Sequence, residues 1–80
     1  GIPCANHNFT TDINVAASLH FLCSIPNPIV MEYCNEPSEI SRALIRDPIR
    51  VVDGYTTVPE EPGLGVEPDP DMLEKYLVRE

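Results

Sequence analysis

The distribution of charge along the chain constrains its fold more than any other feature. Residues 1–34 contain only two acids, Asp12 and Glu32, and no lysine or arginine. The other eleven acids and all five bases lie in residues 35–80. A unit that stands alone needs a solvated face, and the first 34 residues have too little charge to build one. We therefore expect further protein to cover this half on most sides.

Length and net charge exclude several classes of protein. Eighty residues allow one small domain at most, with a marginal core. A formal net charge of −8 argues against nucleic acid and anionic membrane as partners, because both need a basic face. No apolar run approaches the ~18 residues of a membrane span. No basic region followed by an apolar run opens the chain, so we also expect no signal peptide.

The cysteine pattern favours a reducing compartment. Cys4, Cys23 and Cys34 are odd in number and form no C-x-x-C motif, whereas a secreted scaffold of this size carries an even and denser set. The pattern predicts buried free thiols and a cytoplasmic location.

The first half predicts a strand–helix–strand unit. Residues 3–6 form a short extended candidate, and residues 13–23 are apolar nearly all round, which is typical of a helix packed on more than one side. Two prolines end the helix before residues 29–34, a continuous apolar run that suits a strand covered on both faces. This order predicts a βαβ unit with parallel strands and a right-handed crossover.

The second half predicts a looser arrangement. Residues 39–46 favour one or two helical turns, and Asp53-Gly54 between two β-prone runs favours a hairpin over residues 49–58. A proline-rich connection leads to a last helix that begins at Asp69 or Asp71. Four residues supply the apolar stripe of that helix: Met72, Leu73, Tyr76 and Leu77.

His7 and Glu32 are the strongest candidates for chemistry. Each lies at or just past the end of a predicted parallel strand, and such ends share the edge of the sheet at which ligands bind. A histidine and a carboxylate converging there are natural proton-transfer partners. Glu32 also interrupts an apolar strand, and a buried carboxylate needs a hydrogen-bond partner, a metal or a substrate. His20 lies on an apolar helix face, where a hydrogen-bonded core histidine is the expectation.

Two alternatives compete with an enzyme. The pairs Cys4-x-x-His7 and His20-x-x-Cys23 have the ligand types and spacing of a small zinc-binding interaction module. The residues between them are helical and apolar, unlike the turn and hairpin of a zinc finger. A unit that only binds or assembles, without catalysis, is the other alternative.

The order of several short segments resembles the C-terminal part of the enolase superfamily, in particular the mandelate racemase and muconate lactonizing enzyme group. These segments are residues 5–9 (ANHNF), 14–20 (NVAASLH), 26–27 (PN) and 32–33 (EY), then Asp47-Pro48, Asp53-Gly54-Tyr55, Val58-Pro59 and residues 62–67 (PGLGVE). The similarity covers essentially the whole chain, and its order and spacing are more specific than any single piece.

The resemblance implies an α/β fold, a C-terminal fragment of a modified TIM barrel of the (β/α)7β type. Residues 1–46 are then the last βαβ unit, with strands 7 and 8 around a helix at residues 13–24. Residues 47–80 leave the barrel and pack on an α+β capping domain. His7 matches the general acid/base that follows the seventh strand. Glu32 matches the carboxylate of the eighth strand that hydrogen-bonds the substrate or its enolate.

The resemblance also implies the reaction: Mg²⁺-assisted removal of a proton α to a carboxylate, in a sugar-acid dehydratase of the lyase class. Asn8 and Thr10 are candidate substrate-binding residues. The metal ligands, a lysine base and the rest of the barrel and capping domain lie outside this sequence, so we expect the 80 residues alone to be inactive. A racemase or epimerase is the alternative within the family. The complete barrels are expected to form homo-oligomers.

Overall fold

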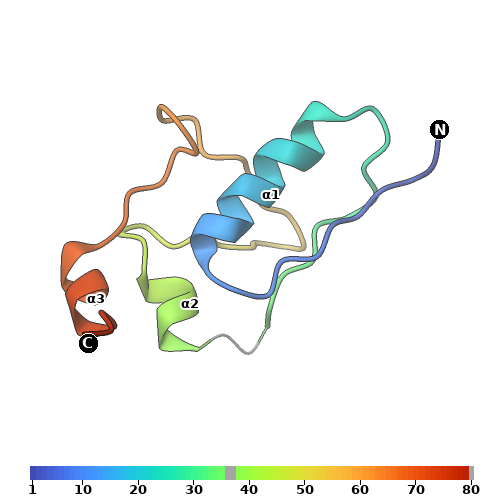
Figure 1. Cartoon of the computed structure of the whole chain (residues 1–80). Helices are drawn as coiled ribbons and strands as arrows, with labels where there is room; N and C mark the ends of the chain where they lie inside the picture. The colour runs from blue at the N-terminus through green and yellow to red at the C-terminus, as the bar shows by residue number, and fades with distance from the viewer. Residues whose placement is uncertain (36–37, 80) are drawn as a thin grey trace.

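The computed structural model describes residues 1–35 and 38–79. Its helices are α1 (Asp12–Ser24), α2 (Glu39–Ala43) and α3 (Pro70–Lys75), and extended chain joins them (Figure 1). The radius of gyration is 13.6 Å, against about 12 Å for a compact domain of this length. The two termini lie at opposite ends of the molecule in Figure 1. This elongated shape leaves many apolar side chains without cover.

Helix α1 confirms the predicted apolar helix. It starts at Asp12, one residue earlier than the apolar pattern indicates, after Thr11 in an extended conformation. It ends at Ser24, because Ile25 precedes a proline and is held out of the helical region. Phe21 remains 47% exposed, so the described chain covers the helix on one side but not all round.

The core lies between α1 and the chain that follows α2. Five buried residues form it: Val15, Ala16, Leu19, Ile45 and Ile49. Partly buried apolar side chains surround this group: Ile13, Met31, Tyr33, Val58 and Val66. Burying each large aliphatic side chain contributes roughly 1.5–3 kcal/mol, so a core this small holds the chain only weakly.

The two predicted strands appear as extended segments joined by a single parallel bridge, Cys4 to Pro28. The Cys4 N–H donates to the Asn27 carbonyl (2.8 Å), and the Ile29 N–H donates to the Cys4 carbonyl (2.9 Å). The parallel order of the predicted βαβ unit is thus present. The prediction of full strands at residues 3–6 and 29–34 was wrong for the described chain. A strand covered on both faces needs neighbours, and Val30 is 63% exposed.

No closed barrel forms within residues 1–35 and 38–79, whose β-pairing consists of isolated bridges. The barrel, the boundary at residue 46 and the capping domain therefore stay predictions. Residues on both sides of that boundary share one core, since Ile45 and Ile49 pack together against α1.

The predicted turn at Asp53-Gly54 is confirmed. Val52 and Tyr55 exchange two backbone hydrogen bonds of 2.8 and 2.9 Å around it. The φ angles of Asp53 and Gly54 are 54° and 78°, as a type I′ turn requires. This bridge is isolated, so the predicted hairpin is limited to the turn and this one pair of residues.

The cysteines are free, as expected, but the prediction that they are buried was wrong, because none of the three is buried. Cys4 and Cys34 are partly buried, whereas Cys23 is exposed near the end of α1. None of the helices in the described part of the chain has the length and apolar character needed to cross a bilayer.

Helix α3 lies beside α2 (Figure 1). Asp69 caps it, accepting a hydrogen bond from the Asp71 N–H at 2.9 Å, and Pro70 occupies its first turn. The Glu39 carboxylate accepts hydrogen bonds from Lys75 Nζ (2.7 and 2.9 Å) and from the Tyr76 hydroxyl (2.6 Å).

These hydrogen bonds shift the pKa values of all three groups. Those from Lys75 and Tyr76 hold the pKa of Glu39 below its ordinary value of 4.5. The bonds to Glu39 raise the pKa of Lys75 above 10.5 and that of Tyr76 above 10.0.

We predict that Gly65→Ala destabilises the protein by more than about 2 kcal/mol. Gly65 has a φ of 78°, and an added Cβ would lie 2.5 Å from the Pro59 Cβ and 3.0 Å from its backbone. Gly63→Ala is the matched control, because its φ of 72° is similar and its Cβ would meet nothing within 4 Å. Urea unfolding measures both variants, and equal losses would contradict the predicted steric clash.

We predict that the contact between α2 and α3 weakens in acid. Because the pKa of Glu39 is lowered on folding, its contribution is complete above pH 4.5 and is lost as the pH falls through the folded-state pKa. The contributions of Lys75 and Tyr76, whose pKa values are raised, are lost instead at high pH. NMR titration of the Tyr76 ring should show its midpoint falling towards 10.0 in Glu39→Gln. An unchanged midpoint would contradict the assignment.

Candidate functional site

The parallel register brings the candidate catalytic residues together. Pro28 follows Cys4 by 24 residues along the chain, and Glu32 follows Asn8 by the same number. The pairing at Cys4 therefore places Glu32 opposite Asn8 and next to His7. The predicted meeting of His7 and Glu32 at one edge is thus observed as a direct contact.

Glu32 contacts both the side chain of His7 and the loop that carries it. Its Oε2 lies 2.7 Å from His7 Nδ1 and accepts a hydrogen bond of 2.8 Å from the Asn8 N–H. Because a carboxylate oxygen accepts, the proton of the neutral imidazole lies on Nδ1. Nε2 is then the nitrogen that takes up or releases a proton. Since both contacts use Oε2, Oε1 is the oxygen that can accept a hydrogen bond from a ligand.

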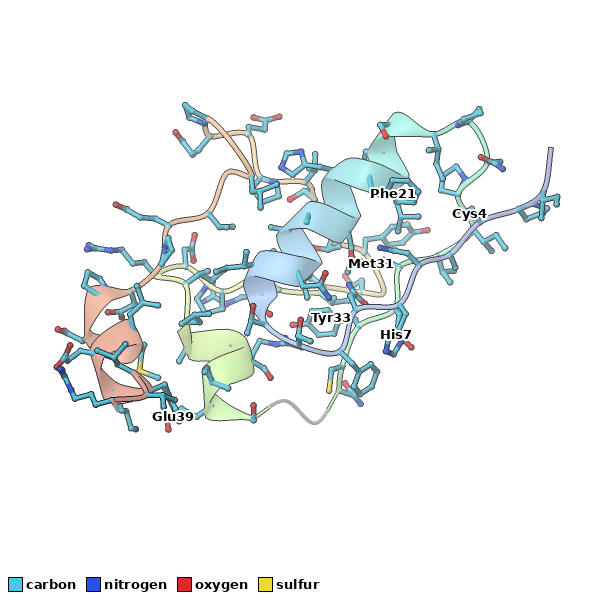
Figure 2. All side chains as sticks on the ribbon, viewed as in Figure 1. Cys4, His7, Phe21, Met31, Tyr33 and Glu39 are labelled. Carbon is cyan, nitrogen blue, oxygen red and sulfur yellow. The ribbon has the colours of Figure 1, made fainter. Side chains whose placement is uncertain are left out.

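The site is open to solvent. The His7 side chain is 79% exposed and the Glu32 side chain 38%. The Phe9 ring stacks on the imidazole, with centroids 5.6 Å apart and planes within 9°. In Figure 2, His7 points away from α1 on the outer side of the extended segments. Water weakens electrostatic stabilisation, so a catalytic site here needs a cover that the described residues do not provide.

The two candidate substrate-binding residues are placed differently. Asn8 is 1% exposed, and both polar atoms of its side-chain amide lack hydrogen-bond partners among the described residues. Its observed contribution is the backbone N–H that it donates to Glu32. Thr10 is exposed in the loop before α1. Substrate binding by Asn8 and Thr10 stays a prediction.

A buried ion pair joins the start of α1 to α2, next to the segments that carry the site. Asp12, the first residue of α1, is fully buried, and its Oδ1 lies 2.5 Å from Nη1 of Arg42 in α2. Its Oδ2 accepts a hydrogen bond from the Ile49 N–H at 3.2 Å. The Arg42 guanidinium also donates to the Cys34 carbonyl (2.6 Å) and lies 4.1 Å from the centre of the Tyr33 ring.

The four residues of the zinc alternative do not converge. Within residues 1–35 and 38–79, no three or more His, Cys, Asp and Glu side chains form a group that could hold a metal ion. His20 instead donates from Nε2 to the Leu64 carbonyl at 2.8 Å, which confirms the expected hydrogen bond. The side chain is only partly buried, so its predicted place in the core was wrong. The described residues also include no group of side chains that could hold Mg²⁺.

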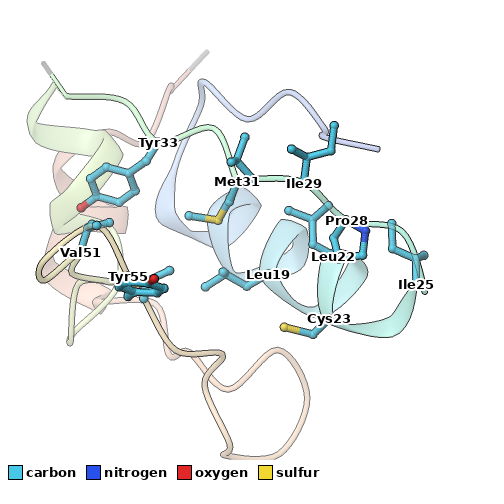
Figure 3. Close-up of a pocket in the computed structure, with 13 residues that line it drawn as sticks. Leu19, Leu22, Cys23, Ile25, Pro28, Ile29, Met31, Tyr33, Val51 and Tyr55 are labelled. Carbon is cyan, nitrogen blue, oxygen red and sulfur yellow. The ribbon is translucent and has the colours of Figure 1, made fainter. Parts of the chain in front are cut away.

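An open apolar groove of about 860 Å³ lies on another face of the molecule (Figure 3). Its walls come from α1, from the extended segment after it and from the type I′ turn. They include Leu19, Leu22, Ile29, Met31, Val51 and Tyr55. Ile29 is 61% exposed and Tyr55 81%, so these side chains have no cover within the described chain.

The sequence analysis identified neither Arg42 nor the buried ion pair of Asp12. The same signal that identified Glu32 was available, because Asp12 is the only other charge in the first half of the chain. A carboxylate next to an apolar helix requires a partner. Its cation lies 30 residues away, and nothing in the local sequence identifies which of the five bases it is.

Comparison with known proteins identifies one matching family and several related enzymes. Residues 1–72 match the family described as enolase C-terminal domain-like. The chain is 38% identical to muconate cycloisomerase 1 of Rhodococcus opacus and 32% identical to D-xylonate dehydratase of Haloferax volcanii. It is 30% identical to D-galactarolactone cycloisomerase of Agrobacterium fabrum.

These alignments cover 95%, 96% and 95% of this chain, but only 21%, 19% and 22% of the respective relatives. The chain therefore spans about a fifth of the length of the curated relatives that it matches.

We predict that Glu32→Ala raises the hydrogen exchange rate of the Asn8 amide about fivefold, because one hydrogen bond contributes about 1 kcal/mol to its protection. Glu67→Ala is the control, since that carboxylate is exposed and lies 3.8 Å from Arg46. NMR-detected exchange measures both variants. An Asn8 rate that rises equally in both would contradict a specific contact with Glu32.

Proposed function

This chain belongs to the enolase C-terminal domain-like family, and we propose that it supplies the histidine–glutamate wall of an active site in a sugar-acid dehydratase. The contact between His7 Nδ1 and Glu32 Oε2 carries the proposal. Family membership and the dehydratase among the relatives support the reaction class. The proposed substrate is a small polyhydroxy carboxylate.

His7 is the proposed acid/base. The carboxylate of Glu32 holds Nδ1–H, so Nε2 carries the lone pair that accepts a proton from the carbon α to the substrate carboxylate. The same nitrogen, once protonated, can return the proton to the departing β-hydroxyl. Phe9 keeps the imidazole plane in place by stacking on it.

Glu32 has two proposed tasks, one for each oxygen. Oε2 orients His7 and the loop of Asn8. Oε1 is directed to the substrate carboxylate or to its enolate, the contact that the family resemblance implies for this position. In this proposal, Glu32 orients His7 in addition to making the substrate contact that the resemblance implies.

The proposed reaction balances without a redox partner. The substrate loses the hydrogen from its α carbon and the hydroxyl from its β carbon, which leave together as water. The resulting enol takes up a proton at the β carbon, releases the proton of its hydroxyl and becomes a 2-keto-3-deoxy acid. His7 Nε2 accepts the α proton or protonates the leaving hydroxyl. The proposed base on the opposite face of the substrate is not among these residues.

Most of the proposed machinery lies outside these residues. Because the described residues form no metal-binding group, we propose that the ligands of an Mg²⁺ ion belong to the remainder of a longer chain. When bound, such an ion stabilises the charge of an enolate. No role in holding it falls to His7 or Glu32. Residues 1–46 are proposed as the last βαβ unit of the barrel, and residues 47–80 as a segment that packs on the cap.

The uncovered surfaces support a larger assembly. The open apolar groove and the 49% exposed Leu73 of α3 are faces that the rest of the barrel and the cap would bury. The free cysteines support a reducing compartment such as the cytoplasm. A homo-oligomer of the complete protein stays a prediction.

A cycloisomerase is the second candidate, because two of the three relatives named above carry that activity. A racemase or epimerase is a third outcome of the same proton abstraction. The products distinguish the three. A dehydratase releases water and a 2-keto acid, a cycloisomerase opens or closes a lactone ring, and a racemase inverts one carbon.

We predict that His7→Asn in the full-length polypeptide lowers kcat by at least about 10²-fold, the usual contribution of a general acid/base. His20→Asn is the matched control, because His20 hydrogen-bonds the Leu64 carbonyl away from the site. Turnover of a panel of sugar acids, with the products identified by NMR, measures both variants. Full activity in His7→Asn would overturn the proposed role, and equal losses in both variants would point to folding.

A further inference from the structure

One side chain connects the two segments that carry His7 and Glu32. The loop of His7 ends at Asp12, where α1 begins, and the segment of Glu32 continues into Tyr33 and Cys34. These two segments are also joined by the bridge at Cys4, by the hydrogen bond that the Asn27 side chain donates to the Ile2 carbonyl, and by the contacts of Glu32 itself. Arg42 holds both of them from the opposite side.

The geometry of Arg42 suits this connection. Nη1 reaches Oδ1 of Asp12, while Nη2 donates to the Cys34 carbonyl at 2.6 Å. The Arg42 Cζ atom lies over the Tyr33 ring, 4.1 Å from its centroid, and the Tyr33 hydroxyl donates to the Ile49 carbonyl at 2.8 Å. In Figure 2, Tyr33 lies close to α1, against whose buried side chains it packs.

We propose that Arg42 is a positioning residue, which sets the distance between the loop of His7 and the segment of Glu32. The inference rests on the proposed function, since it concerns the same two residues. Arg42 touches neither of them. It acts through Asp12 at the end of one segment and through the Cys34 carbonyl at the end of the other.

Binding Asp12 and the Cys34 carbonyl at the same time requires the two terminal nitrogens of a guanidinium group. Its two terminal nitrogens donate in fixed directions and its flat face stacks on an aromatic ring. Lysine would keep the charge beside Asp12, but a single ammonium cannot reproduce both the fork and the stacking. The Arg42 side chain is 18% exposed and Asp12 is fully buried, so water replaces these contacts poorly.

The test compares Arg42→Lys with Arg46→Lys in the full-length polypeptide. Arg46 is the matched control, because its nearest carboxylate, that of Glu67, lies 3.8 Å away at the surface. We expect Arg42→Lys to lower kcat roughly 10- to 100-fold, the scale of a misplacement of about 1 Å, with KM within about twofold of the unmodified protein. In its crystal structure, the distance from His7 Nδ1 to Glu32 Oε2 should increase beyond hydrogen-bonding range. Arg46→Lys should leave both readouts unchanged.

A purely structural role for Arg42 predicts a different result. The melting temperature of Arg42→Lys would fall, while kcat, measured well below that temperature, and the distance from His7 to Glu32 would remain unchanged. That result overturns the proposal. If Arg42→Lys does not fold, Asp12→Asn removes the charge of the other partner and should lower kcat in the same direction with KM retained. Full kcat in a folded Asp12→Asn would equally overturn the proposal.

The two proposals fail in distinguishable ways. Activity that persists in His7→Asn overturns the proposed function, whatever Arg42 does. Activity lost in His7→Asn but retained in Arg42→Lys, with the contact from His7 to Glu32 intact in the crystal, overturns only the positioning role.

Discussion

The ion pair between Asp12 and Arg42 is the interaction on which the arrangement of this chain depends. Asp12 is fully buried at the start of α1, and its two oxygens bind Arg42 of α2 and the Ile49 N–H. Removing one partner of a buried pair leaves an unpaired charge, which costs about 3–5 kcal/mol. A small core cannot offset a loss of that size. The pair therefore decides how α1, α2 and the chain after α2 meet.

The candidate site lies on the other side of the same framework. The parallel bridge at Cys4 sets the register, and the register places Glu32 against His7 and Asn8. The resulting dyad has a defined orientation but no cover, and the apolar groove beside α1 has none either. Both observations agree with a chain that spans about a fifth of the length of its relatives.

The features that the sequence predicted are those with local causes. Helix α1 follows from its apolar run and the prolines after it, the turn from Asp53-Gly54, and α3 from Asp69 and Pro70. The meeting of His7 and Glu32 followed from element order alone. The full strands did not form, because strands need neighbours that residues 1–35 and 38–79 lack. The partner of Asp12 was not predictable, because pairing across 30 residues leaves no local pattern.

A crystal structure of the full-length polypeptide with a bound sugar-acid analogue tests the central claim most directly. The account predicts His7 Nε2 at about 3–3.5 Å from the carbon α to the ligand carboxylate, with Nδ1 still on Glu32 Oε2 and with Oε1 facing the ligand. A ligand bound elsewhere in the protein, with His7 and Glu32 turned towards solvent, would contradict it.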